Sequence, residues 1–124
     1  MRFEPGRSIY EQIVEYIENQ VLTGERLPGD RLPSVRELAV DVGVNPNTVQ
    51  RSYSRLQESG LIYNQRGVGY FVADDAEERT RTIRRREFET EMLPRVFETM
   101  DAVGYTVGEL QDAWQTWRNQ GETT

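Results

Sequence analysis

Residues 32–72 read LPSVRELAVDVGVNPNTVQRSYSRLQESGLIYNQRGVGYFV, and this stretch decides the fold. It contains, in order, a short helical pattern, a brief turn, a second helical pattern, and two runs of aromatic and β-branched residues around an Arg-Gly pair. This order is typical of a winged helix-turn-helix, whose second helix lies in the major groove of duplex DNA. A DNA-binding regulator is therefore the first hypothesis.

Capping residues predict where the two helices begin and end. Ser34, with Glu37 three positions later, has the spacing of a capping box, and Gly43 ends the first helix. Asn45 and Pro46 restart a helix almost at once, because Asn accepts from free first-turn amides and Pro suits the first helical position. One face of this second helix carries Val49, Tyr53 and Leu56, and the opposite face carries Asn47, Arg51 and Ser54.

The flanking segments complete the predicted DNA-binding domain, residues 1–74. A first helix begins at Ser8, and its buried side is expected to carry Ile9, Ile13, Ile17 and Val21. Residues 27–33 form a fixed connector, because two prolines and a glycine forbid regular helix there. Residues 61–63 and 70–72 are expected to pair as a two-stranded wing around a tight turn.

Residues 75–124 are expected to form a helical tail. Pro94 predicts a kink in a long first helix whose apolar stripe starts at Ile83, and Thr106 with Glu109 caps a last helix. The stripe is wider than two helices alone could hide, so we expect the tail to pair with its copy. The predicted dimerisation residues are Phe88, Met92, Val96, Phe97, Met100, Leu110, Trp114 and Trp117. The predicted fold class is α+β, mostly α: an N-terminal winged helix-turn-helix followed by a two-helix C-terminal dimerisation tail.

The side-chain inventory excludes several function classes. The chain has no Cys and no His, which leaves no thiol nucleophile, no imidazole base and no zinc site built from them. It also has no Lys to hold pyridoxal phosphate as a Schiff base. We therefore predict no metal, no cofactor and no enzymatic activity. No apolar run approaches the ~18 residues of a membrane span, and we expect a cytoplasmic protein.

The net charge of -6 argues against DNA binding if taken alone, because neutralising phosphates requires surplus basic residues. The placement of the charges matters more than their sum. Within residues 45–72 the bases Arg51, Arg55 and Arg66 stand against the single acid Glu58. The predicted reading surface is thus cationic on an acidic chain.

Several motifs in the same order resemble the GntR family of bacterial transcription regulators. The family pattern Pro-Gly-Asp-x-Leu-Pro-Ser-x-Arg-x-Leu-Ala stands at residues 28–39. The turn and helix at residues 43–53 and the wing at residues 66–72 look most like the YtrA-like subfamily. The resemblance covers about residues 8–73, and extends to the tail only in length and type. Val68 and Tyr70 depart from it, standing where a basic residue and a small hydroxyl residue are common, and Pro46 replaces the Arg of relatives outside this subfamily.

The resemblance implies a homodimer on a palindromic operator. Such regulators usually repress their own operon, often together with genes for an ATP-driven transporter. The family's DNA contacts carry over onto Arg36, Asn45, Asn47, Thr48, Gln50, Arg51, Arg66 and Gly67.

Physical chemistry assigns roles to part of this set. Free amides at a helix N-terminus attract phosphate, so Ser34 and the first turn after Asn45 are expected to anchor the protein without reading sequence. Asn47 and Gln50 match adenine and Arg51 matches guanine, each good pair contributing about 1–3 kcal/mol of discrimination. Arg66 is expected to reach phosphate or a minor groove.

Other interpretations remain open for several of these residues. Arg36 could pair with Glu37 or Asp41 instead of DNA. The basic run at residues 84–86 could extend the DNA footprint, but we favour a solvated face paired with neighbouring acids. Trp114 and Trp117 fit an interface better than a ligand cage. The alternative function is a winged-helix module that binds protein without binding DNA, and an unknown small-molecule effector remains a candidate partner.

Overall fold

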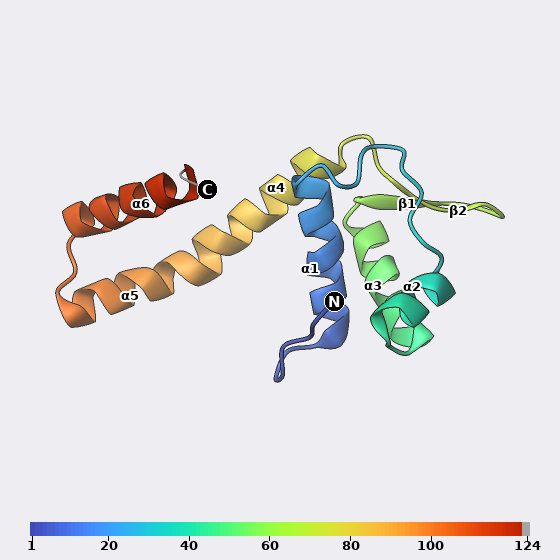
Figure 1. Cartoon of the computed structure of the whole chain (residues 1–124), viewed down its shortest axis with the longest axis horizontal. Coiled ribbons are helices and arrows are strands. Elements are labelled where there is room, and N and C mark those ends of the chain that lie inside the picture. The colour runs from blue at the N-terminus through green and yellow to red at the C-terminus, as the bar shows by residue number, and fades with distance from the viewer. Residues whose placement is uncertain (123–124) are drawn as a thin grey trace. The chain divides into compact units, whose positions relative to one another are not determined.

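The computed structural model describes residues 1–122 and is mostly helical, with one small sheet (Figure 1). Its elements are α1 (Ile9–Leu22), α2 (Val35–Val42), α3 (Pro46–Glu58), β1 (Ile62–Gln65), β2 (Gly69–Val72), α4 (Ala76–Glu87), η1 (Phe88–Met92), α5 (Leu93–Val103) and α6 (Val107–Glu122). They form two compact units, Met1–Arg84 and the residues from Arg85 onward. The predicted α+β class, with a winged helix-turn-helix followed by tail helices, is confirmed. The predicted functional boundary after residue 74 stays a prediction.

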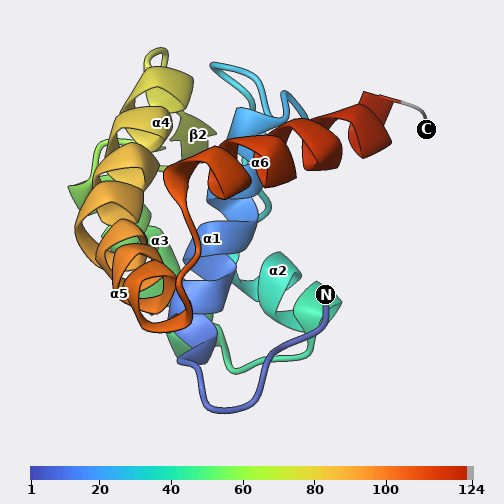
Figure 2. The same cartoon turned by 90° about the vertical axis from the view of Figure 1, so that its left-hand side faces the viewer.

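The N-terminal unit is built on α3, which packs against both α1 and α2. Figures 1 and 2 show α1 and α3 side by side. The buried apolar side chains come from every element of the unit: Ile13, Ile17, Val21, Leu32, Leu38, Ala39, Val49, Tyr53, Leu56, Leu61, Ile62, Val72 and Ala76. Ile9 is 43% exposed, so the buried face of α1 starts one turn later than predicted.

Helices α1, α2 and α3 begin at the predicted capping residues. The Ser8 and Ser34 hydroxyls accept from the amides of Glu11 (3.3 Å) and Glu37 (3.1 Å). Asn45 Oδ1 accepts from the Asn47 amide at 2.8 Å. These bonds satisfy amides that no helical carbonyl can reach, and they fix where each helix starts.

The predicted two-stranded wing is confirmed, and a further segment lies against it. β1 and β2 pair antiparallel, with Ile62 opposite Val72 and Gln65 opposite Gly69. The segment before α2, expected to be a plain connector, runs along the other side of β2 and pairs Arg31 with Phe71. Its backbone bonds include Leu32 N to Tyr70 O (2.9 Å) and Val72 N to Asp30 O (2.9 Å). The connector is therefore bridged to β2 at Arg31 but is not itself a strand of the two-stranded sheet.

The first turns of α4 belong to the N-terminal unit. Ala76 and Thr80 are completely buried, and Ile83 packs against the same core. Arg84 then binds α1, with its Nε 3.0 Å from Glu18 Oε1 and an NH2 nitrogen 2.8 Å from Asn19 Oδ1. The prediction that Ile83 starts the tail stripe is wrong, because the N-terminal core takes this side chain.

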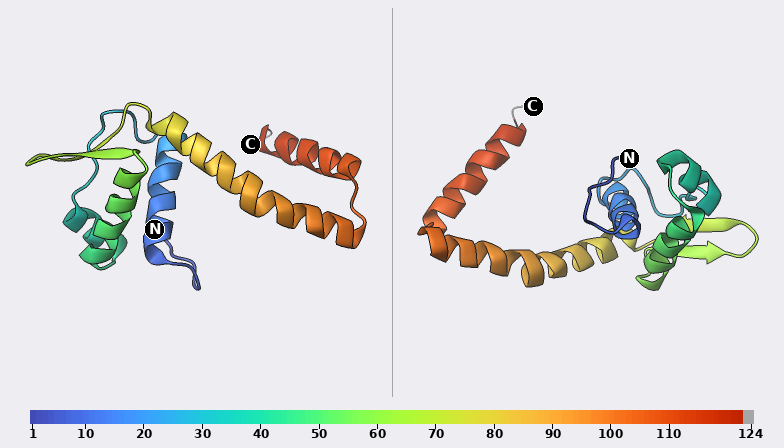
Figure 3. Two further views of the ribbon diagram at one scale, coloured as in Figure 1. Left: turned by 180° about the vertical axis from the view of Figure 1, so that it is seen from behind. Right: turned by 90° about the horizontal axis from the view of Figure 1, so that it is seen from below.

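The second unit is a helical hairpin in which α6 turns back from the end of α5 (Figure 3). Around the predicted kink the helix adopts a π-helical turn, in which Leu93 N donates to Phe88 O five residues earlier. Pro94, which lacks an amide hydrogen, follows at once. Thr106 and Glu109 form the predicted capping box, each amide lying 3.1 Å from the other's side-chain oxygen. No helix within residues 1–122 is long and apolar enough to cross a membrane.

Candidate nucleic-acid interface

The two faces of α3 divide as the sequence predicts. Val49, Tyr53 and Leu56 are fully buried, whereas Asn47, Gln50 and Arg51 are exposed. The Tyr53 hydroxyl donates to Pro33 O at 2.7 Å, and burial raises the pKa of this phenol, so the buried face stays neutral. The core therefore holds α3 from behind and presents its polar face outward.

Ser34 and Asn45 are predicted DNA contacts, but their side-chain oxygens already accept hydrogen bonds within the protein. Each oxygen accepts an amide of its own helix, as described above. Asn45 is exposed and Ser34 is half-buried. Their first contribution is to order the N-termini of α2 and α3, whose remaining first-turn amides can meet a phosphate.

Arg36 and Thr48 lie on the first turns of α2 and α3. Arg36 is exposed and makes no ion pair with Glu37, Asp41 or any other acid within the described part of the chain. The intramolecular pair considered for Arg36 is thus not formed. Thr48 is half-buried, and its backbone carbonyl lies 3.1 Å from Ser52 Oγ. Arg36 is free to bind phosphate, while Thr48 is partly enclosed.

Gln50 joins α3 to the wing. Its Nε2 lies 3.3 Å from the hydroxyl of Tyr70 in β2 and 3.4 Å from Ser54 Oγ. The Tyr70 ring meets the Tyr53 ring edge-on, with centroids 5.1 Å apart. A predicted base-reading amide is therefore held by two hydroxyls, one of them in the wing.

Arg51 stacks on a residue of α1. Its guanidinium carbon lies 3.7 Å from the centroid of the Tyr10 ring, a cation–π contact. These two residues, with Ser8, Ile9, Asn47 and Thr48, line an open depression of about 400 Å³. The structure thus brings Asn47 and Arg51 to one concave surface.

The wing tip carries Arg66 and Gly67 in a tight turn closed by Val68 N to Gln65 O at 2.9 Å. Gly67 has a φ of 78°, a conformation that side chains rarely adopt, so glycine is required there. Arg66 is exposed and has no acidic partner among residues 1–122. The turn projects this cation away from the core.

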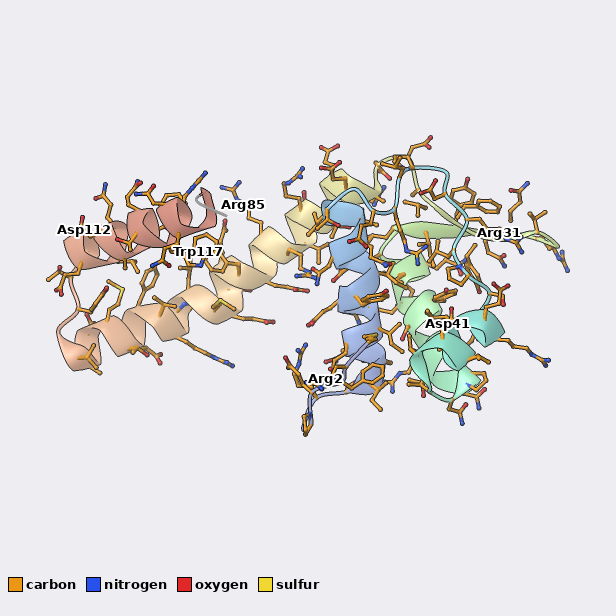
Figure 4. All side chains as sticks on the ribbon, in the orientation of Figure 1. Arg2, Arg31, Asp41, Arg85, Asp112 and Trp117 are labelled. Atoms are coloured by element: carbon orange, nitrogen blue, oxygen red, sulfur yellow. The ribbon has the colours of Figure 1, made fainter. Side chains whose placement is uncertain are left out.

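Three residues at this surface were missed by sequence reasoning: Tyr10, Tyr70 as the partner of Gln50, and Arg31. Arg31 runs along the wing (Figure 4), and a Cβ on Gly69 would lie only 3.1 Å from its Nε. No local pattern reveals Tyr10, because its contact depends on how α1 packs on α3. The sequence contained one signal for Arg31. A charged residue followed by the apolar Leu32 is typical of an extended segment with one buried face, and Leu32 is buried.

The basic run after the wing does not act as one surface. Arg84 binds Glu18 and Arg85 pairs with Glu89 at 3.1 Å, whereas the nearby Arg81 pairs with Glu77. Arg31, Arg36, Arg51, Arg55 and Arg66 form no ion pair within residues 1–122. These five arginines lie on α2, α3, the wing and the segment beside it, and their charge is available for phosphate. Arg2, Arg26, Arg86, Arg95 and Arg118 also form no ion pair within residues 1–122, but they lie elsewhere in the chain.

The predicted dimerisation residues all lie in the second unit. No residue of η1 or α5 is buried there. Exposure reaches 45% for Phe88, 58% for Met92, 52% for Phe97 and Trp114, and 69% for Trp117. Val96, Met100 and Leu110 are half-buried and line a groove of about 400 Å³ with Met92 and Tyr105. The described part of this unit has an apolar face but no closed core.

Comparison with known proteins identifies the N-terminal unit. The sequence profile described as "Bacterial regulatory proteins, gntR family" matches residues 9–72, which span α1 to the end of the wing. The chain belongs to the GntR family. The family and the curated relatives are transcriptional regulators with a helix-turn-helix and not enzymes, in agreement with the class that the sequence predicted.

Individual relatives agree with this assignment. The chain is 46% identical over 68 residues to the transcriptional repressor YtrA of Bacillus subtilis, covering 55% of this chain and 52% of that protein. A putative GntR-family regulator from Bacteroides thetaiotaomicron is 35% identical with a TM-score of 0.78, over 91% of this chain and 98% of the other. The match covers between half and two thirds of the length of YtrA and of a second regulator from Bacillus subtilis that is also 46% identical.

A third comparison includes DNA. The DNA-binding domain of AraR, solved in complex with the operator ORR3, is 30% identical with a TM-score of 0.50, over 59% of this chain and 93% of that domain. The matched part of this GntR-family chain thus has the fold of a domain that was solved on an operator.

Proposed function

We propose that this chain is a repressor that binds a palindromic operator as a homodimer, with α3 in the major groove and the wing beside it. One observation carries the proposal: the exposed polar face of α3, with Asn47, Gln50 and Arg51, stands on a helix whose other face is fully buried. A rigid helix with exposed amide and guanidinium groups is what reading base edges requires.

Base reading is assigned to three side chains. The amides of Asn47 and Gln50 each offer the donor and acceptor that pair with adenine, and Arg51 offers two parallel donors for guanine. These groups lie on successive turns of one face, so they can meet neighbouring base pairs. Loss of either amide should relax the preference at one position of each half-site.

Phosphate binding is assigned to the remaining predicted contacts. Arg36 and Arg66 supply unpaired charge, and Gly67 lets the wing approach closely without a side chain. Ser34, Asn45 and Thr48 bring first-turn amides and hydroxyls of α2 and α3 to the same side. These contacts fix the position of α3 on the duplex but do not depend on sequence.

The second unit is proposed to form the dimer. Its aromatic and methionine side chains are exposed in the single chain, and association would remove them from water. A two-fold dimer also provides the second recognition helix that a palindrome needs. We place the protein in the cytoplasm, where its operator is, and propose control of its own operon and of transporter genes by analogy with the subfamily.

The groove of about 400 Å³ along α5 suggests an effector as a second proposal. Its volume falls in the range of small-molecule sites, and its lining is apolar. A ligand there would compete with dimer contacts at Met92 and Met100, and would lower operator affinity. Added ligands that change neither dimerisation nor DNA affinity would leave the groove to the dimer interface alone.

Footprinting of the full chain on DNA upstream of its own gene tests the proposal. We expect protection of two inverted half-sites with centres about one helical turn apart, and two chains per duplex by light scattering. Asn47→Ala should relax the preference at one position of each half-site, as measured by competition with single-base variants of the operator. An unchanged preference in Asn47→Ala would overturn the base-reading assignment of Asn47. A parent chain that selects no sequence would instead favour the protein-interaction module.

A further inference from the structure

We infer that Tyr10 of α1 is a positioning residue that holds Arg51 in its base-reading orientation. The inference rests on the proposed function, in which Arg51 reads a base. Tyr10 lies outside the helix-turn-helix, yet the centroid of its ring is 3.7 Å from the guanidinium carbon of Arg51.

Tyr10 is itself held in place by α3. Ser52 is completely buried, and its hydroxyl lies 2.9 Å from the backbone carbonyl of Tyr10. Two consecutive residues of α3 therefore contact Tyr10, Arg51 through the ring and Ser52 through the backbone. Because the Ser52 contact uses a backbone atom, replacing the side chain at position 10 leaves the α1–α3 connection intact.

The stack leaves Arg51 able to bind a base. A guanidinium lying over a ring presents its flat face to the ring, while its N–H donors point outward in the plane. The open depression shared with Asn47 lies at this point of the surface. Since a side chain already held in one orientation loses less freedom on binding, the ring should raise the selectivity of Arg51.

The variants must separate loss of the aromatic ring from loss of side-chain volume and from loss of helix stability. Tyr10→Leu removes the aromatic face but keeps an apolar side chain, and Tyr10→Phe keeps the face but removes the hydroxyl. Tyr10→Gln serves as a second variant without a ring. The thermal unfolding of each full-length variant is compared with that of the parent chain. If either Tyr10→Leu or Tyr10→Gln does not fold, the remaining one of these two serves as the variant without a ring.

Selection from a pool of random duplexes measures the base preference at every position of the bound site. The parent chain should select a sequence in which one position of each half-site loses its preference in Arg51→Ala. At that same position, Tyr10→Leu and Tyr10→Gln should lower the preference about two- to fivefold, as expected for a partly exposed cation–π contact. Tyr10→Phe should keep it. In an Arg51→Ala background, Tyr10→Leu should have no further effect.

Other results separate the inference from the function beneath it. If the parent chain selects no sequence, or if Arg51→Ala keeps the base preference at every position, Arg51 does not read a base. The role of Tyr10 is then overturned as well. If Arg51→Ala loses its position but Tyr10→Leu and Tyr10→Gln do not, only the role of Tyr10 is overturned. An equal loss at all positions, or tighter operator binding when the ring is removed, would also overturn it.

Discussion

The side-chain amide of Gln50 in the recognition helix lies 3.3 Å from the hydroxyl of Tyr70 in the wing. Behind this contact, Tyr70 packs edge-on against Tyr53, whose own hydroxyl is bonded to Pro33 O. A chain of contacts therefore runs from the buried core to the Gln50 amide, which is proposed to read a base. The wing thus holds a side chain of α3, in addition to its proposed contact with DNA.

Removing the Tyr70 hydroxyl tests this relationship. Tyr70→Phe keeps the ring contact with Tyr53 but frees Gln50, so it should lower discrimination at the Gln50 position about two- to tenfold, the range of one neutral hydrogen bond. Competition binding with single-base operator variants measures it. Tyr63→Phe, which removes an exposed hydroxyl on the other face of the wing, is the matched control. Equal discrimination in Tyr70→Phe and the parent would show that the contact has no role in reading.

The wing cations should act through charge alone. Arg66→Ala and Arg31→Ala should each weaken binding to all duplexes alike and reduce the slope of log affinity against log salt by about one. Arg86→Ala removes an equal charge from α4 and serves as the control. An unchanged slope for Arg66→Ala would remove the wing tip from the interface, and a reduced slope for Arg86→Ala would add the basic run to it.

Asn45 allows capping and DNA binding to be separated. Asn45→Ala should cost about 1 kcal/mol of stability, because the Asn47 amide loses its acceptor. Asn45→Asp keeps an acceptor and places negative charge at the positive end of α3, so stability should be retained. Its operator affinity should still fall, since the carboxylate faces phosphate. Denaturant unfolding and gel shifts measure the two effects, and intact DNA binding in Asn45→Asp would place Asn45 away from the duplex.

The tail should fail to dimerise when its apolar face carries charge. Phe97→Lys should raise the dimer dissociation constant by about tenfold or more, because an unpaired charge would be buried on association. Glu98→Lys, on the neighbouring exposed position, should have little effect. Analytical ultracentrifugation at several micromolar concentrations measures both. A parent chain that is monomeric there, or equal weakening by the two variants, would contradict the proposed interface.

The local parts of the fold could be predicted from the sequence because short-range chemistry determines them. Ser34 and Asn45 cap their helices through amides two or three residues away. The spacing of Val49, Tyr53 and Leu56 fixes which face of α3 is buried, whatever it packs against. The exposed positions of Asn47, Gln50 and Arg51 follow from the same helical period.

The contacts between distant segments could not be predicted in this way. Ile83 continues the tail stripe in sequence, but the N-terminal core offers it a closer apolar partner. The partners of Gln50 and Arg51 come from β2 and α1, and no local spacing relates these residues. Arg84 was expected on a solvated face and instead binds Glu18, whose side chain is only 9% exposed.

The bridge beside the wing changes how the hairpin can meet other chains in a crowded cell. A bare two-stranded hairpin has two open edges, and each is a template for strand addition by another chain. Here residues 29–32 lie along the outer edge of β2 and bond to Tyr70 and Val72. Much of that edge is therefore unavailable for strand addition, which should lower the tendency of the wing to aggregate.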